Sequence, residues 1–282
     1  MKFSFSGMRI SSLVTVVPKK ELYFDDEIDQ FNFAKANSMK LKKIMGFNKH
    51  RIVEDGTCAS DLCVCGLNRL FDAQVLRKDE IDVLIFVSQS PDHFIPPTSN
   101  IIQGKVGLGN DVLCLDINQG CAGFVLGLIQ AFTFLNLPEI HKVVLLNGDT
   151  LSRKVCKRDR NIYPMIGDAG SVTVVEKCSE APSIHATVRM DGSRSNSLMI
   201  PAGGFRLPSS PETAIEEKVG DNNYRSKDQF YMDGPGVFNF VQTVVPPMID
   251  ELLAFAGVQR ESVIIFFSIN RTNSCSKNWP TR

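Results

Sequence analysis

One stretch, residues 116–129 with the sequence DINQGCAGFVLGLI, constrains the fold more than any other part of the chain. The aliphatic run over 112–117 predicts a strand, and the polar residues that follow, ending in Gly120, predict a tight turn. An apolar stretch over 122–135 is long enough for a buried helix. Cys121 therefore stands where the chain passes from the turn into the helix.

The position of Cys121 at the start of a helix suggests a nucleophile. The first turn of a helix carries unpaired backbone N–H groups and a positive partial charge, which stabilise a thiolate. A thiolate attacks carbonyl carbon far more readily than a thiol does. Most cysteines outside disulfides are instead small buried hydrophobic residues, so the local pattern alone leaves both interpretations open.

Three motifs in a fixed order extend this picture. They are DINQGCAGF at 116–124, LSRKVCKRDRNIYPMIGDAGSVTVVE at 151–176 and YMDGPGVFNF at 231–240. Together they resemble the ketoacyl-synthase III branch of the thiolase-fold enzymes, the β-ketoacyl-acyl-carrier-protein synthases III, from about residue 7 to 266. The resemblance implies an α/β thiolase-like fold with two similar βαβ-rich halves in a layered α-β-α-β-α arrangement, of which the second is incomplete. Residues 1–178 and 179–266 would form these halves.

The resemblance also implies an activity. Cys121 would be the catalytic residue that takes an acyl group from an acyl thioester, either of coenzyme A or of acyl-carrier protein. A decarboxylative Claisen condensation with malonyl-acyl-carrier protein would follow, in fatty acid biosynthesis. These thioesters are substrates, and we expect no other cofactor. The partners implied are acyl-carrier protein and a second copy of the chain in a homodimer.

Further binding residues follow from the same resemblance. Arg160 matches an arginine that lies against the adenine of coenzyme A, whereas the tryptophan that faces it in the family has no counterpart here, which leaves the acyl donor open. Ile166 and Gly167 match the glycine turn beside the acyl pocket. Phe94 and Ile95 lie in a loop with three prolines, whose tip in relatives closes the partner subunit's acyl pocket. Covering their own subunit's core is the alternative for these two residues.

Composition excludes several other classes of protein. The 282 residues carry a formal net charge of zero, so nothing suggests the basic stripe of a nucleic-acid-binding protein. No apolar run is long enough to span a bilayer, and the first 17 residues lack the continuous apolar region of a secretory signal, so we expect a cytoplasmic protein without a membrane partner. The 8 cysteines are irregularly spaced, and no histidine lies at zinc-ligand spacing from the cluster at 58–65, so we expect no metal site.

Hydrophobic patterning predicts the remaining elements. We expect strands over 8–17, 83–87, 142–146 and 171–175, with 83–87 buried on both faces because it is almost wholly apolar. We expect exposed helices within 21–44, a helix that begins near 59 and ends between 71 and 76, and surface excursions over 179–228. A helix over 237–255 is expected to be broken or kinked at the two prolines 246–247.

The resemblance fails near position 267. The family continues there with a His-Gln-x-Asn motif that its condensation step needs, whereas the last of the 4 histidines here is His185. The codons of 267–282, read in the shifted frame, admit Leu-His-Gln-Gln-Asn, and Trp279 forces a Leu-Ala pair in that frame. We therefore expect a frameshift near 265–267, an out-of-frame tail over 267–282 and impaired condensation. Two alternatives stay open: a related synthase that makes a specialised metabolite or a surface-sugar acyl group, and a truncated pseudoenzyme.

Overall fold

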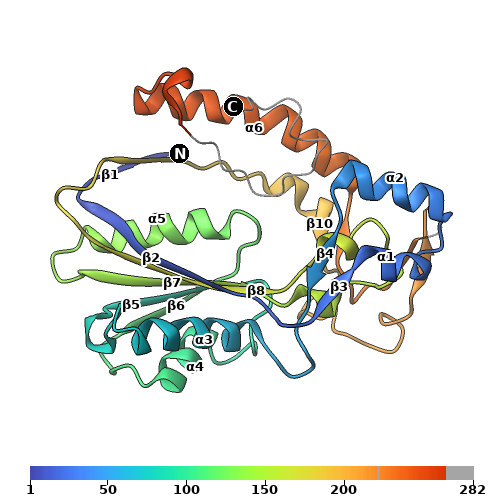
Figure 1. Ribbon diagram of the computed structural model, residues 1–282, viewed down its shortest axis with the longest axis horizontal. Coiled ribbons are helices and arrows are strands. Elements are labelled where there is room, and N and C mark those ends of the chain that lie inside the picture. Colours follow the sequence, from blue (N-terminus) through green and yellow to red (C-terminus); the bar gives the residue numbers. More distant parts are fainter. Residues whose placement is uncertain (221–222, 265–282) are drawn as a thin grey trace.

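A five-stranded mixed sheet forms the centre of the computed structural model, which describes residues 1–220 and 223–264 (Figure 1). Its strands, in spatial order, are β2 (Met8–Val16), β8 (Ala169–Lys177), β7 (Lys142–Asp149), β5 (Val83–Val87) and β6 (Leu113–Ile117). Strands β6, β5 and β7 run parallel to one another, and β7, β8 and β2 pair antiparallel. The five strands expected from the sequence are all present in this sheet.

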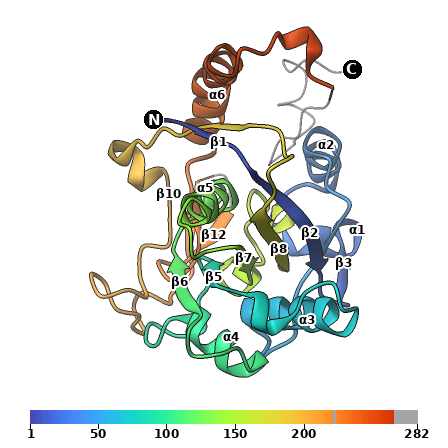
Figure 2. The ribbon, with the colours of Figure 1, turned by 90° about the vertical axis from the view of Figure 1, so that its left-hand side faces the viewer.

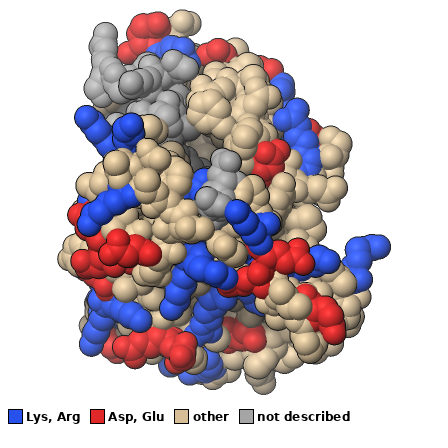
Figure 3. All heavy atoms as spheres, turned by 90° about the vertical axis from the view of Figure 1, so that its right-hand side faces the viewer, with Lys and Arg blue, Asp and Glu red and all other residues tan. Residues whose placement is uncertain are grey.

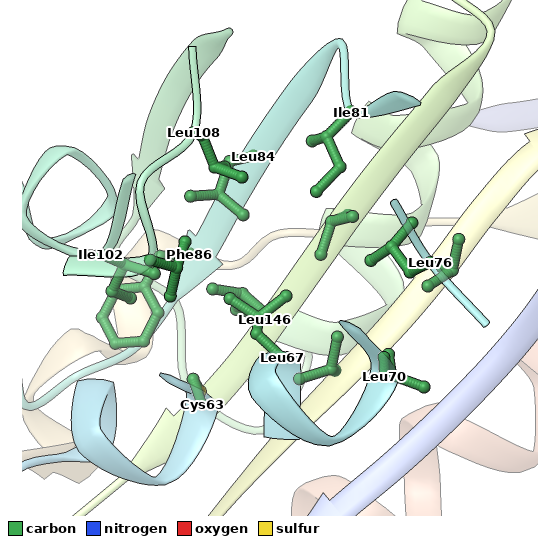
Figure 4. Close-up of a cluster of buried hydrophobic side chains, with 14 of the residues drawn as sticks. Cys63, Leu67, Leu70, Leu76, Ile81, Leu84, Phe86, Ile102, Leu108 and Leu146 are labelled. Atoms are coloured by element: carbon green, nitrogen blue, oxygen red, sulfur yellow. The ribbon is translucent and has the colours of Figure 1, made fainter. Parts of the chain in front are cut away.

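Helices cover both faces of the sheet. Helices α3 (Ala59–Asp72) and α4 (Thr98–Val106) pack on one face, and α5 (Gly123–Leu135) packs on the other (Figures 1 and 2). All five residues of β5 are buried, as expected for a parallel strand between two helical layers. Leu84 and Phe86 point toward α3 and α4, whereas the alternate residues of β5 point toward α5 (Figure 4).

A third apolar cluster lies away from the sheet and differs from the sequence expectation. Residues 21–44 form β3 (Glu21–Tyr23), α1 (Phe24–Glu27), a 3-10 turn (Ile28–Gln30) and α2 (Lys35–Met45), and β3 pairs with β4 (Lys49–Arg51). The prediction of exposed helices is wrong for the first part of this segment. Phe24, Ile28 and Phe31 are buried against Val155, Ile162 and Tyr163, because apolar partners far along the chain cover them.

The remaining elements are short, except for one helix. Strand β1 (Lys2–Phe5) pairs with β9 (Ile184–Thr187), β10 (Leu198–Met199) with β13 (Tyr231–Met232), and β11 (Glu217–Val219) with β12 (Asn223–Arg225). Five of these strands lie within 179–232, mostly in the segment expected to be surface excursions. Further 3-10 turns span Lys78–Glu80, Leu151–Lys154, Tyr163–Met165, Gly192–Ser197 and Arg260–Ser262.

Helix α6 (Gly234–Ala256) runs through both of its internal prolines. The helix is therefore not broken at Pro246 and Pro247, although each proline removes one backbone donor, and the expected kink stays a prediction. The division into two similar halves at 178 stays a prediction. The expected out-of-frame tail over 267–282 lies outside the described residues.

Candidate active site

The loops that carry the predicted site leave the sheet at one edge. Val87, Ile117 and Asn147 are in register at the carboxyl ends of the three parallel strands. Strand β8 begins at the same edge, because Asp149 at the end of β7 pairs with Ala169 at the start of β8. The loops after β5, β6 and β7 and the turn before β8 therefore meet there, as in other α/β sheets that bind ligands at the carboxyl ends of their strands.

Cys121 lies in the loop after β6, two residues before the first residue of α5, and it is exposed. The backbone N–H of Gly123 donates to the carbonyl of Gly120 at 2.7 Å, which closes a tight turn around the cysteine. The first helical hydrogen bond follows directly, from the N–H of Leu126 to the carbonyl of Ala122 at 3.0 Å. The strand, turn and helix expected around Cys121 are thus confirmed.

Two glycines let α5 approach the sheet closely. A Cβ atom at Gly123 would lie 2.6 Å from Val87 Cγ1, and one at Gly127 would lie 2.6 Å from Leu145 Cδ1. Only glycine fits at such distances without moving its neighbours. These contacts hold the start of α5, and with it Cys121, against the ends of β5 and β7.

A partly buried carboxylate organises the loop next to Cys121. Asp149 Oδ1 accepts the backbone N–H of Gln89 at 2.8 Å and the hydroxyls of Ser88 and Ser90 at 3.1 and 2.8 Å. Burial raises the pKa of Asp149, although the hydrogen bonds from Ser90 and Gln89 oppose this shift. The side chain of Gln89 then reaches the cysteine turn, since a Cβ at Gly120 would lie 2.8 Å from Gln89 Oε1. Sequence reasoning did not identify Asp149, although an acidic residue at the end of a buried strand is a signal that could have indicated it.

The aspartate of the cysteine motif has a structural task. Asp116 accepts the backbone N–H groups of Thr98 and Ser99 at 2.7 and 2.8 Å. These are the first two residues of α4, so the carboxylate satisfies donors that the helix itself leaves unpaired. Asp116 therefore connects the strand before Cys121 to the end of the loop that carries Phe94 and Ile95.

Ile166 and Gly167 lie at the turn before β8, beside the segment around β4. A Cβ at Gly167 would lie 3.2 Å from the carbonyl oxygen of Arg51. The next residue, Asp168, is 2% exposed, and its carboxylate accepts the N–H of Val53 at 2.8 Å. The same carboxylate accepts the Ser152 hydroxyl at 2.6 Å, so it links three loops at the site edge. These hydrogen bonds of Asp168 therefore anchor the turn to the two neighbouring loops.

Arg160 is 6% exposed and is held on two sides. Its guanidinium carbon lies 4.1 Å from the centre of the Phe33 ring, which is the geometry of a cation–π contact. Its NH1 group donates to Asn223 Oδ1 at 3.1 Å. Phe33 therefore supplies an aromatic face for Arg160. The sequence did not indicate this contact, because the family's tryptophan has no counterpart here.

Phe94 and Ile95 are 72% and 83% exposed, so the structure does not place them in their own subunit's core. The Phe94 ring lies 5.7 Å from the ring of Phe205, which is itself 89% exposed. The predicted site residues thus fall into groups with different neighbours: Phe94 lies beside Phe205, whereas Arg160 and the Ile166–Gly167 turn lie beside residues 24–51. Cys121 has Gln89 next to its turn.

A sequence relative decides the family. Over 275 residues, 97% of this chain, the sequence is 30% identical to a protein of Campylobacter jejuni named as a 3-oxoacyl-[acyl-carrier-protein] synthase 3, of which it covers 77%. The chain belongs to the 3-oxoacyl-[acyl-carrier-protein] synthase III family. A family model described as 3-oxoacyl-[acyl-carrier-protein] synthase III matches residues 115–192, which contain Cys121 and the Ile166–Gly167 turn. The Beta-ketoacyl-[acyl-carrier-protein] synthase III of Syntrophomonas wolfei is 32% identical over 78% of this chain, which spans 64% of that protein.

Solved structures of the synthase III family confirm the thiolase-like α/β fold. The crystal structure of a 3-oxoacyl-(acyl-carrier protein) synthase from Burkholderia xenovorans superposes with a TM-score of 0.88 and 31% identity, covering 98% of this chain and 77% of that one. A synthase III from Thermus thermophilus superposes with a TM-score of 0.72 at 21% identity, which supports the fold alone. The family consists of acyltransferases that condense acyl groups.

Metal-binding clusters and membrane-spanning helices are both absent from the described residues. Within 1–220 and 223–264, no group of three or more His, Cys, Asp or Glu side chains could hold a metal ion. No helix in this part of the synthase III chain is long and apolar enough to cross a membrane. Figure 3 shows basic and acidic side chains interspersed on the face at the right-hand side of Figure 1, so that face carries no large patch of one sign.

Proposed function

We propose that this chain acts as a 3-oxoacyl-[acyl-carrier-protein] synthase III whose acyl group is carried by Cys121. The observation that supports it most is the exposed Cys121 at the start of α5, at the edge where the loops after β5, β6 and β7 meet. The sulfur attacks the carbonyl carbon of an acyl thioester and a new S–C bond forms. The donor thiol, of coenzyme A or of acyl-carrier protein, leaves with the proton of Cys121.

The second step is the condensation that gives the family its name. Malonyl-acyl-carrier protein loses CO₂, and the electron pair of the broken bond forms an enolate that attacks the acyl carbon on Cys121. The S–C bond then breaks, and a ketoacyl-acyl-carrier protein leaves, as in the first elongation step of fatty acid biosynthesis. We propose that this step is impaired in the present sequence, since residues 267–282 do not contain the His-Gln-x-Asn motif that the family resemblance predicts there. The partner protein is acyl-carrier protein, and the proposed location is the cytoplasm.

The binding roles of the other residues rest on their positions at the same edge. Ile166 and Gly167 would form a wall of the acyl site, because their turn precedes the start of β8. Arg160 would contribute charge to the donor's phosphates from beneath the surface, because it is 6% exposed. Arginine keeps its charge at any physiological pH, so this contribution does not titrate.

We also propose a homodimer built on β6 and the Phe94 loop. In the described sheet β6 is an edge strand, and Leu113 at its start is 46% exposed. An apolar edge strand of this kind pairs readily with another chain. Sedimentation should show a dimer for the natural chain and a monomer for Leu113→Arg. Leu137→Arg, at a residue equally exposed (49%) beside the far end of β8, is the control that should stay dimeric.

Intact-protein mass spectrometry tests the acyl transfer. After mixing with acyl-coenzyme A or acyl-acyl-carrier protein, the natural chain should gain one acyl group on the peptide that contains Cys121. Cys121→Ser should gain none, whereas Cys65→Ser, which changes another exposed cysteine, should behave like the natural chain. An acyl group found elsewhere, or on no residue, would refute the proposal. Adding malonyl-acyl-carrier protein then measures condensation separately.

A further inference from the structure

His50, on strand β4, belongs to a buried polar cluster that the acyl-transfer chemistry does not use. Its side chain is 7% exposed, and the side chain of Glu27, its partner from α1, is 6% exposed. The imidazole Nδ1 lies 2.5 Å from the carbonyl oxygen of Ile166, and Nε2 lies 3.0 Å from Glu27 Oε2. The ring of Tyr163 packs edge-on at 5.1 Å. The histidine thus connects α1 with the turn before β8.

The two partners determine how many protons the ring carries. A backbone carbonyl only accepts hydrogen bonds, so Nδ1 must be protonated. An ionised carboxylate also only accepts, so Nε2 must be protonated as well. A ring that donates from both nitrogens is an imidazolium, and here it forms a charge-assisted pair with Glu27. A neutral ring would require a proton on Glu27 instead.

The charged groups around the ring favour the imidazolium. Glu27 faces it from α1 and Asp168 from the turn before β8, and both are acidic. The Tyr163 hydroxyl bonds to Glu27 as well, which leaves the carboxylate in the accepting role. Arg51, the next residue on β4, points its guanidinium away, toward Glu21 and the Pro18 carbonyl. Burial acts to lower the pKa of His50, but the bonds to Glu27 and to the Ile166 carbonyl outweigh it and raise the pKa.

The element that His50 holds is the Ile166–Gly167 turn. The carbonyl of Ile166 takes the Nδ1 proton, and the N–H of Asp168 donates to the carbonyl of Arg51 at 2.8 Å. Between these two bonds, a Cβ at Gly167 would lie 3.7 Å from the Cβ of His50. The turn is therefore fixed to β4 on both sides of its glycine.

We propose that His50 is a positioning residue, held as an imidazolium between Glu27 and Ile166, that fixes the Ile166–Gly167 turn for acyl-donor binding. The part of this inference that concerns the acyl donor rests on the proposed function, because that proposal places the turn in the wall of the acyl site. The proton state and the fixing of the turn do not depend on it. When the ring loses its proton, one of its two bonds is lost and the turn loosens.

Nitrogen-15 NMR of the histidine rings in the full chain tests the proton state. Both nitrogens of His50 should show the chemical shifts of an imidazolium at pH 7. This pH lies above the ordinary histidine pKa of about 6.5, so an unperturbed ring is mostly neutral there. Amide hydrogen exchange supplies the second readout: the protection factor of the Asp168 N–H, in which the general acceleration of exchange by base is divided out, should fall once the pH passes the point at which His50 titrates. A neutral His50 ring at pH 7 would overturn the inference. So would a protection factor of the Asp168 N–H that stays constant while His50 titrates. Neither readout depends on catalysis.

Two variants test the link to the acyl donor. His50→Gln keeps one donor and loses the charge, so KM for the acyl thioester should rise by about tenfold, the effect of one bond to a charged group. The rate at which iodoacetamide alkylates Cys121 should change by less than about twofold, because the histidine acts on the turn and not on the sulfur. His50→Arg restores a charge and several donors and should recover most of the loss. Equal KM values in all three proteins would refute the positioning role, whereas a natural chain that transfers no acyl group would refute the proposed function alone.

Discussion

Asp116 Oδ2 accepts the backbone N–H of Thr98 at 2.7 Å, so the aspartate of the cysteine motif caps the helix that follows the Phe94 loop. This bond joins strand β6 to the first residue of α4, which follows the loop after β5. Its partner is a helix start, where four N–H groups lack intrahelical acceptors. Asp116 thus holds α4 and the preceding loop against β6, and it has no role in the proposed chemistry of the thioester.

Removing this cap should weaken the fold and the loop together. Asp116→Ala deprives Thr98 and Ser99 of their shared acceptor and should lower the free energy of unfolding by about 1–2 kcal/mol. Asp116→Asn keeps one accepting oxygen and should cost less. Urea denaturation of both variants measures the difference. An alanine variant as stable as the natural chain would show that the cap contributes nothing.

The close approach of α5 predicts opposite effects for two helical glycines. Gly127→Ala should destabilise the protein by about 1–3 kcal/mol, because the new methyl would lie 2.6 Å from Leu145 Cδ1. Gly104→Ala, within α4, has nothing within 4 Å and should stabilise by about 0.5–1 kcal/mol. Thermal unfolding compares the two. Effects of the same sign would contradict the packing described for α5.

The environment of Cys121 predicts its reactivity. Iodoacetamide should alkylate Cys121 at least about threefold faster than Cys65, because the start of α5 stabilises negative charge on a nearby sulfur. Cys65 is the matched control, since it is also exposed but lies in the middle of α3. Peptide mapping over time gives both rates within one sample. Slower alkylation at Cys121 would argue against its role as the nucleophile.

The His50–Glu27 pair predicts how stability depends on pH. The pKa of His50 is raised in the folded state, so the folded protein binds more protons than the unfolded one near neutrality. The stabilisation from this pair is therefore complete below about pH 6.5 and is lost as the pH rises through the raised value. Urea unfolding from pH 6 to 9 should show this decline in the natural chain. The same decline in His50→Gln would assign it to another group.

Much of the central sheet was predictable from the sequence. Residues 83–87 form β5 with the expected bounds, because an apolar run of this length that is rich in β-branched and aromatic residues is typical of a buried strand. The strand at 142–146 extends further, to Asp149, because the polar residues 147–149 pair with the start of β8. Sequence patterns carry little information about such pairing.

The candidate site was predictable only in part. Cys121 was found because the strand, turn and helix signals follow one another directly within residues 112–135, and signals of this kind depend only on neighbouring residues. Phe33 was missed because nothing near it in the sequence indicates that it lies on Arg160, more than a hundred residues away. The buried positions of residues 24–31 were missed for the same reason.

The sequence by itself determined the strands β5 and β6, the helix α5, the place of Cys121 at a helix start, and the family, whereas α4 was not predicted. These properties depend on residue types and spacings that act locally. Only the tertiary structure decided that Asp149 organises the loop beside Cys121 and that His50 holds Ile166, which lies 116 positions further along the chain. Hydrogen bonds and burial of this kind arise when distant segments are brought together, and no periodicity in the chain encodes the distance between them.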